Sequence, residues 1–192
     1  MIQYPTKKKT SDQKGISTRN RGMSLEHDLN LTNEYYRIHE LANVHKKPTP
    51  IQVVAVSYPS RNQAKIVEAY YKTPSTTDYN GVTQGVYFDF EAKEVTDQQR
   101  FSLQRIHQHQ IDHLRDIVKH KGCAFLIIRF VKHDVTFYVP FEKFDQEMKS
   151  TQRRSIPLTW FQSECAIIQH GFAPPLHYLP HVHQWIKETY EK

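Results

Sequence analysis

The chain has 192 residues, of which 38% are hydrophobic and 12% aromatic, and its formal net charge is +6. This length and composition fit one folded domain with a hydrophobic core. The two cysteines exclude a disulfide-rich scaffold, and the sequence shows no apolar run typical of a signal peptide or a membrane span. We therefore expect a cytoplasmic protein with reduced cysteines.

Positive charge is concentrated in two segments. Residues 1–22 carry six Lys or Arg and one Asp, and residues 46–72 carry five Lys or Arg and one Glu. Such clustering suits neutralisation of nucleic-acid phosphates, although a solvated tail and a charged loop are the ordinary alternative. We expect residues 1–18 to form a flexible basic arm and residues 19–192 to form a single domain.

Hydrophobic periodicity and turn residues predict alternating helices and strands. The expected elements are a helix over about 23–41 capped by Ser24, a strand over 51–56, a short helix-like piece between Pro59 and Pro74, a turn at Asn80 and Gly81, a strand over 85–94, a helix over about 103–120, strands over 122–130 and 134–141, helices over 141–148 and 155–168, and an irregular C-terminal tail that ends as a helix. This order indicates an α/β fold, a sheet with flanking helices.

The segment "DYNGVTQGVYFDFEAKE" carries the strongest chemical signal. Strand alternation puts Glu91 and Lys93 on one face, with Cα atoms roughly 6–7 Å apart, and puts Phe88 and Phe90 on the other face. Asp78 precedes a turn that can bring it beside them. Two converging carboxylates bind a hard cation such as Mg²⁺, and a nearby lysine can stabilise a negative transition state. The alternative is an exposed strand face with an ordinary Glu–Lys pair.

Gln110 is the polar member of an otherwise apolar helical stripe. A buried amide needs a partner, which is either a neighbouring backbone group or, through its carbonyl oxygen or a water, the metal. The same helix carries His107, His109 and His113. Zinc is an alternative there, but His107 points away from the other two, so solvent-facing or phosphate-contacting histidines are favoured.

These stretches together resemble the RecU family of Holliday junction resolvases, which have the PD-(D/E)XK nuclease fold. The matching strings are "NRGMSLEHDLNLTNEYY" (20–36), "HKKPTPIQVV" (45–54), "AYYKTPSTTDYNG" (69–81), "YFDFEAKE" (87–94), "HQHQIDH" (107–113) and, more loosely, "IIQHGFAPPLHYL" (167–179). The resemblance implies a restriction-endonuclease-like mixed central sheet flanked by helices. It also implies a protruding stalk, here an insert at about residues 50–74.

The resemblance implies roles for individual residues. Magnesium-binding positions fall on Thr76, Asp78, Glu91 and Gln110, with Mn²⁺ as a substitute cation, and the catalytic set is Asp78, Glu91 and Lys93, with Lys93 as transition-state stabiliser. Glu26 is a possible additional active-site carboxylate, or a glutamate that the helix dipole favours near an N-terminus. The DNA-binding candidates are Arg19, Arg21, Arg61, Lys65, Tyr71 and Lys72.

The implied function is Mg²⁺-dependent resolution of Holliday junctions by paired symmetric nicks, during homologous recombination, DNA repair and chromosome segregation. The family resemblance further implies a homodimer, a nucleoid-associated cytoplasmic location, and RecA recombinase and a branch-migration helicase as partners. Two alternatives stay open: a non-catalytic junction-binding protein that modulates the recombinase, and a sequence-specific nuclease of the same fold.

Overall fold

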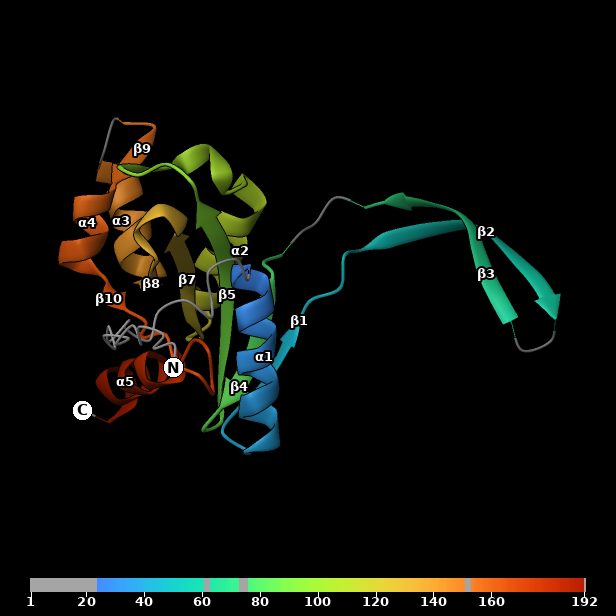
Figure 1. The fold of residues 1–192 in the computed structure, drawn as a ribbon, viewed down its shortest axis with the longest axis horizontal. Helices are drawn as coiled ribbons and strands as arrows, with labels where there is room; N and C mark the ends of the chain where they lie inside the picture. Colours follow the sequence, from blue (N-terminus) through green and yellow to red (C-terminus); the bar gives the residue numbers. More distant parts are fainter. Residues whose placement is uncertain (1–23, 61–62, 73–75, 151–152, 192) are drawn as a thin grey trace, which may run out of the picture.

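The computed structural model describes residues 24–60, 63–72, 76–150 and 153–191. Its centre is a six-stranded sheet with the order β1-β4-β5-β7-β8-β10 (Figure 1). β5 and β7 run parallel and the other neighbours run antiparallel, so the predicted mixed sheet is confirmed. The strands are β1 (Asn43–Lys46), β4 (Tyr79–Thr83), β5 (Val86–Val95), β7 (Cys123–Phe130), β8 (Val135–Pro140) and β10 (Ala166–Ile167).

Helices cover both faces of this sheet. α1 (Leu25–Ile38) and α5 (Leu179–Tyr190) pack on one face, and α2 (Gln108–Lys119), α3 (Phe141–Ser150) and α4 (Leu158–Glu164) pack on the other. β7 is buried along its whole length and alternates between the two cores. A short pair, β6 (Arg100–Ser102) and β9 (Ser155–Pro157), and two 3₁₀ turns, Leu103–Arg105 and Val131–His133, complete the body.

A long antiparallel hairpin projects from the body (Figure 1). It consists of β2 (Ile51–Ser60) and β3 (Gln63–Tyr71), and almost all of its described residues are exposed. The helix-like piece expected after Pro59 is therefore wrong. Ile66, Val67 and the tyrosines that follow are β-branched or aromatic, and such side chains favour a strand once a partner strand is available.

The turn expected at Asn80 and Gly81 is also wrong, because both residues lie inside β4. The turn falls at Gln84 and Gly85, whose φ angles of 50° and 75° suit a two-residue hairpin. Gly81 is required for close packing: a Cβ there would lie 2.6 Å from Cζ of Phe88 and 2.7 Å from the carbonyl oxygen of Asn43.

Most of the other predicted elements are present with changed boundaries. Ser24 caps α1 as predicted, because its Oγ accepts a hydrogen bond from the backbone N–H of His27 at 3.2 Å. The helix expected over 155–168 is confined to α4, since its ends form β9 and β10. None of the described helices is both long and apolar enough to cross a membrane.

Candidate active site

The pairing of β4 with β5 places Asp78 opposite Glu91. Tyr79 pairs with Phe90, so the residue before Tyr79, which is Asp78, faces the residue after Phe90, which is Glu91, across the two antiparallel strands. The backbone N–H of Asp78 donates to Glu91 Oε2 at 3.1 Å, and the backbone N–H of Ala92 donates to Asp78 Oδ2 at 3.3 Å. Two residues that lie 13 positions apart in the chain are thus brought together at one end of β4, as the sequence predicted.

Glu91 is the chemically unusual member of this pair. Its side chain has no solvent exposure, so the alternative of an exposed strand face is wrong. Burial, and then the charge of Asp78, raise the pKa of Glu91 to about 7, while Lys93 opposes the rise. The Lys93 ammonium donates a short hydrogen bond to Glu91 Oε1. The site therefore holds a carboxylate close to its protonation midpoint at neutral pH, beside a lysine.

A cavity of about 720 Å³ joins the other predicted site residues. It is lined by Thr76, Asp78 and Gln110, and also by His107 and His109. The two imidazole rings stack with centroids 5.5 Å apart, and His109 Nε2 is buried without a hydrogen-bond partner among the described residues. Three side chains predicted to bind metal therefore face one solvent-accessible space.

The side chain of Gln110 forms a hydrogen bond with a backbone group, which is one of the two alternatives that the sequence left open. Its Oε1 accepts a hydrogen bond from the N–H of His107 at 3.1 Å, which caps the N-terminus of α2. A carbonyl oxygen has two lone pairs, so this bond leaves one acceptor position free. Gln110 is buried and lines the cavity, and it can therefore serve the helix and a ligand together.

The donor set fits a hard cation. Asp78 and Glu91 carry carboxylate oxygens, and Thr76 and Gln110, which line the cavity with Asp78 but not with Glu91, carry neutral oxygens. Burial, followed by the charges of Glu26, Asp78 and Glu91, raises the pKa of the neighbouring Tyr79. The described residues contain no group of three or more His, Cys, Asp or Glu side chains that could hold a metal. Two carboxylates with neutral oxygens and waters are the ordinary surroundings of Mg²⁺.

Glu26 lies at the edge of this site. Its Oε1 accepts from Lys46 Nζ at 2.5 Å, and both side chains are largely exposed. A second cavity, of about 400 Å³, is lined by Glu26, Lys46 and Asp78 among others. The structure thus brings Glu26 near Asp78, and its role as an additional active-site carboxylate stays a prediction.

Sequence reasoning did not find the surroundings of Asp89, which is fully buried on the same face of β5 as Glu91. Its carboxylate is bonded by Lys47 and Thr77, and also contacts Tyr87 and His113. The alternation of β5 already indicated the position of Asp89. Its partners gave no local signal, since Lys47 is 42 residues away and His113 is 24 residues away.

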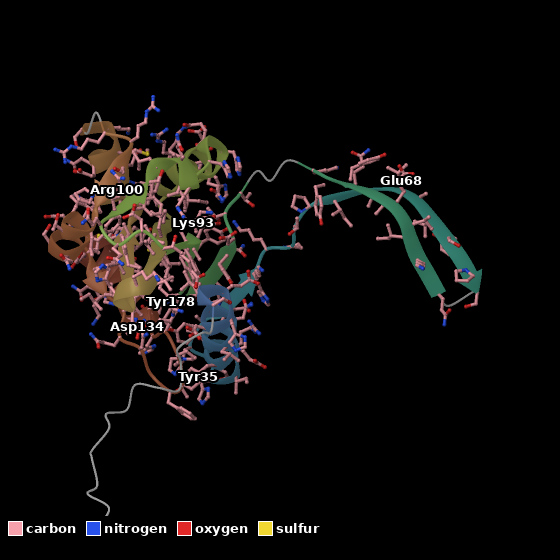
Figure 2. The ribbon with its side chains drawn as sticks, turned by 45° about the horizontal axis from the view of Figure 1, so that its top comes forward. Tyr35, Glu68, Lys93, Arg100, Asp134 and Tyr178 are labelled. Carbon is pink, nitrogen blue, oxygen red and sulfur yellow. The ribbon has the colours of Figure 1, made fainter. Side chains whose placement is uncertain are left out.

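The predicted DNA-binding residues lie mainly on the hairpin. Lys65 and Tyr71 are on β3, and Lys72 follows it directly. Tyr71 is 84% exposed. Figure 2 shows Glu68 midway along the same strand, away from the body, and Lys93 within the body. Arg19, Arg21 and Arg61 lie outside the described residues, as does the predicted arm at 1–18. Contact of these residues with DNA stays a prediction.

The family model RecU, described as "Recombination protein U", matches residues 20–184. Three relatives named Holliday junction resolvase RecU illustrate the similarity. One from Listeria monocytogenes serotype 4a (strain HCC23) is 50% identical over 162 residues, covering 83% of this chain and 81% of the relative. One from Listeria innocua is 45% identical and covers 93% and 95%. One from Staphylococcus carnosus is 44% identical and covers 95% and 90%.

A looser likeness relates this chain to a solved structure of Archaeoglobus fulgidus Hjc, whose title describes it as a Holliday junction resolvase from an archaeal hyperthermophile. The TM-score is 0.41 with 10% identical residues, and the superposition covers 72% of this chain and 92% of the other. The family assignment depends on the sequence relatives.

Proposed function

This chain belongs to the RecU family, and on that premise we propose that it cuts four-way DNA junctions with the site built around Asp78, Glu91 and Lys93. The function that it shares with the family is Holliday junction resolution, which is an endonuclease activity. The observation that supports this site best is the buried Glu91, whose raised pKa and contacts with Asp78 and Lys93 are typical of a functional carboxylate.

Mg²⁺ is the cation that we propose, held by Asp78 and Glu91 with Thr76 and Gln110 as neutral donors. When bound, it would polarise a phosphoryl oxygen and lower the pKa of a coordinated water. Glu91 must be ionised to act as a ligand, and the Lys93 ammonium favours that ionised form. As a cation beside Glu91, Lys93 would also stabilise the extra negative charge on a phosphate under attack.

Junction recognition is assigned to the β2–β3 hairpin. It combines the lysines at 65 and 72 with the exposed aromatic rings of Tyr58, Tyr70 and Tyr71. Lysines can contact phosphates, and aromatic rings can stack on bases that are unpaired at a crossover.

Paired nicking implies two active sites, whereas the described part of one chain contains a single candidate site. We therefore propose a homodimer with two-fold symmetry, which presents equivalent sites to opposed strands of the junction. RecA and a branch-migration helicase stay predictions from the family resemblance.

A cleavage assay on a mobile four-way junction with Mg²⁺ tests the proposal. Wild type should make symmetric nicks, and Asp78→Ala and Lys93→Ala should lose cleavage while they keep junction binding. Lys187→Ala, which changes an exposed lysine on α5, is the matched control. Junction binding without cleavage by wild type, in Mg²⁺ and in Mn²⁺, would instead support the non-catalytic binding protein. Cutting of linear duplex at a fixed sequence would support a sequence-specific nuclease.

A further inference from the structure

The segments that precede and follow the β2–β3 hairpin both form hydrogen bonds with one buried carboxylate, that of Asp89. Lys47 lies on the segment that leads into the hairpin, and its Nζ donates to Asp89 Oδ2 at 2.6 Å. Thr77 lies on the segment that leads out, and its hydroxyl donates a short hydrogen bond to Asp89 Oδ1. The two segments also meet directly, since Lys47 Nζ donates to Thr77 Oγ1 at 3.0 Å.

The Asp89 carboxylate is enclosed by further partners. The Tyr87 hydroxyl donates to its Oδ2 at 2.7 Å, and His113 Nε2 of α2 lies 3.1 Å from the same oxygen. Asp89 itself has no solvent exposure. A buried ion pair of this kind contributes little net stability when intact, but removal of one partner leaves an uncompensated charge. The main effect of the Lys47–Asp89 ion pair is therefore to fix the positions of the segments that it joins.

The same contacts lead to the catalytic carboxylates. Asp78 follows Thr77 in the chain, and its carbonyl oxygen accepts a hydrogen bond from the Lys47 backbone N–H at 2.8 Å. Asp89 precedes Glu91 by two residues on β5 and shares its face of the strand. A shift of Lys47 or Thr77 relative to Asp89 thus moves Asp78 relative to Glu91.

We propose that Asp89 is a positioning residue, which fastens both ends of the hairpin to β5 and thereby sets Asp78 against Glu91. Asp89 does not contact substrate in this arrangement, because its carboxylate is already enclosed by four side chains. The inference depends on the proposed function, since Asp78 and Glu91 are the pair that Asp89 is held to position. It adds that junction binding by the hairpin and metal binding by the carboxylates share a single anchor.

The test compares full-length wild type with Asp89→Asn and Lys47→Met. Each variant should lower the rate of junction cleavage about 10- to 100-fold, the range expected when a reacting group is misplaced by about 1 Å. The Mg²⁺ concentration for half-maximal rate should rise several-fold, and junction affinity without metal should fall in the same variants, because the hairpin loses its anchor to β5. Calorimetric titration of Mg²⁺ into the DNA-free protein should show the same weakening, which provides a readout independent of activity.

A matched control separates positioning from general destabilisation. Asp28→Asn changes another buried aspartate, whose Oδ2 accepts from Arg129 Nη2 at 2.6 Å. It should lower thermal stability without raising the Mg²⁺ requirement. The double variant Lys47→Met/Asp89→Asn should lose no more activity than the worse single variant, because the two residues act as one unit.

The outcomes are distinct. If Asp89→Asn behaves as Asp28→Asn does, with lower stability and unchanged Mg²⁺ binding, the proposal is overturned. If Asp89→Asn does not fold, Thr77→Val decides the matter, because it removes only the hydroxyl that bonds Asp89 and should weaken Mg²⁺ binding in the same direction. Failure of wild type to cut junctions would reject the proposed function, whereas the DNA-free Mg²⁺ titration would still test the positioning of Asp78 by Asp89.

Discussion

Asp89 and Glu91 lie two residues apart on the same face of β5, are both fully buried and each contact a lysine, yet they differ in their other partners. Asp89 is enclosed by an ammonium, two hydroxyls and an imidazole. Glu91 contacts Lys93 and the backbone N–H of Asp78, and its pKa rises to about 7 because of burial and the charge of Asp78. Asp89, which is enclosed by four side chains, therefore suits the positioning role proposed for it, and Glu91, which has fewer partners, suits the catalytic role proposed for it.

The raised pKa of Glu91 predicts a stability that depends on pH. Between its ordinary value of 4.5 and about 7, folded Glu91 keeps a proton that the unfolded chain releases, so stability falls as pH rises through that window. The loss is complete above pH 7 and reaches about 3 kcal/mol at most. In metal-free buffer, Glu91→Gln should therefore gain stability relative to wild type between pH 4 and pH 8, as measured by urea unfolding. A difference that stays constant with pH, or one that Mg²⁺ leaves unchanged, would contradict the prediction.

Removal of the Lys93 charge should act on both rate and pH dependence. Lys93→Met deletes the cation that lowers the pKa of Glu91, so the acidic limb of the pH–rate profile should move to higher pH. The rate at pH 7.5 should fall about 10²- to 10³-fold, as is usual when a charge-stabilising group is removed. Cleavage rates from pH 5.5 to 9 check this, with Lys187→Met as control. An unshifted profile would mean that Glu91 does not limit the reaction.

The double role proposed for Gln110, as a cap of α2 and a metal ligand, predicts a difference between two substitutions. Gln110→Ala loses both the cap of α2 and the neutral donor, so stability should fall by about 1 kcal/mol and the Mg²⁺ requirement should rise. Gln110→Glu keeps an acceptor for the His107 N–H and adds a negative charge, so the cap should survive and Mg²⁺ should bind at least as well. Thermal unfolding and Mg²⁺ titration of both variants measure the two effects separately. Equal Mg²⁺ affinity in wild type and Gln110→Ala would remove Gln110 from the metal site.

Gly81 and Gly85 should respond to alanine for different reasons. Gly81→Ala forces a Cβ into the Phe88 ring and the Asn43 carbonyl, which should cost about 1–3 kcal/mol and disturb the β4–β5 register at the site. Gly85→Ala has open space but a φ of 75°, so it should cost about 1 kcal/mol. Chemical denaturation of both variants gives the comparison. Greater destabilisation by Gly85→Ala would show that the stability of the β4–β5 pair depends more on the turn than on the packing at Gly81.

Substitutions on the β2–β3 hairpin should separate the contribution of charge to junction binding from that of base stacking. Combined Lys65→Ala and Lys72→Ala should weaken junction binding and reduce the slope of log affinity against log salt by about 2. Tyr71→Ala should weaken binding through lost stacking, by about 1–3 kcal/mol, and leave the salt slope unchanged. Fluorescence anisotropy at several salt concentrations distinguishes the two. Unchanged affinity in both variants would place junction binding elsewhere on the protein.

Local features of the sequence indicated a cluster of two carboxylates and a lysine, and the family resemblance implied that this cluster is an active site. The cap at Ser24 and the alternation that puts Glu91 and Lys93 on one face depend on neighbouring residues alone, and both are present. Asp78 was expected beside Glu91 because a turn was expected after it, but the turn expected at Asn80 and Gly81 would have put Asp78 opposite Thr83. The pairing of Asp78 with Glu91 depends on the turn at Gln84 and Gly85. The prediction of a turn at Asn80 and Gly81 was wrong because Gly81 is present for a different reason, since a Cβ there would clash with the Phe88 ring. The local preference of an Asn-Gly pair for a turn does not reveal such a packing requirement.

Periodicity and capping by themselves indicated an α/β fold and placed Glu91 and Lys93 on one face of a strand, since these signals act over a few positions. The mixed sheet of the nuclease type, the protruding insert and the proposed site residues were implied by the family resemblance. Only the tertiary structure decided that Gln63–Tyr71 is a strand, that Glu91 is buried, and that Asp89 joins both ends of the hairpin. These features depend on contacts between distant parts of the chain. Burial and partner identity, unlike periodicity, are properties of the packed molecule, and no single segment carries them.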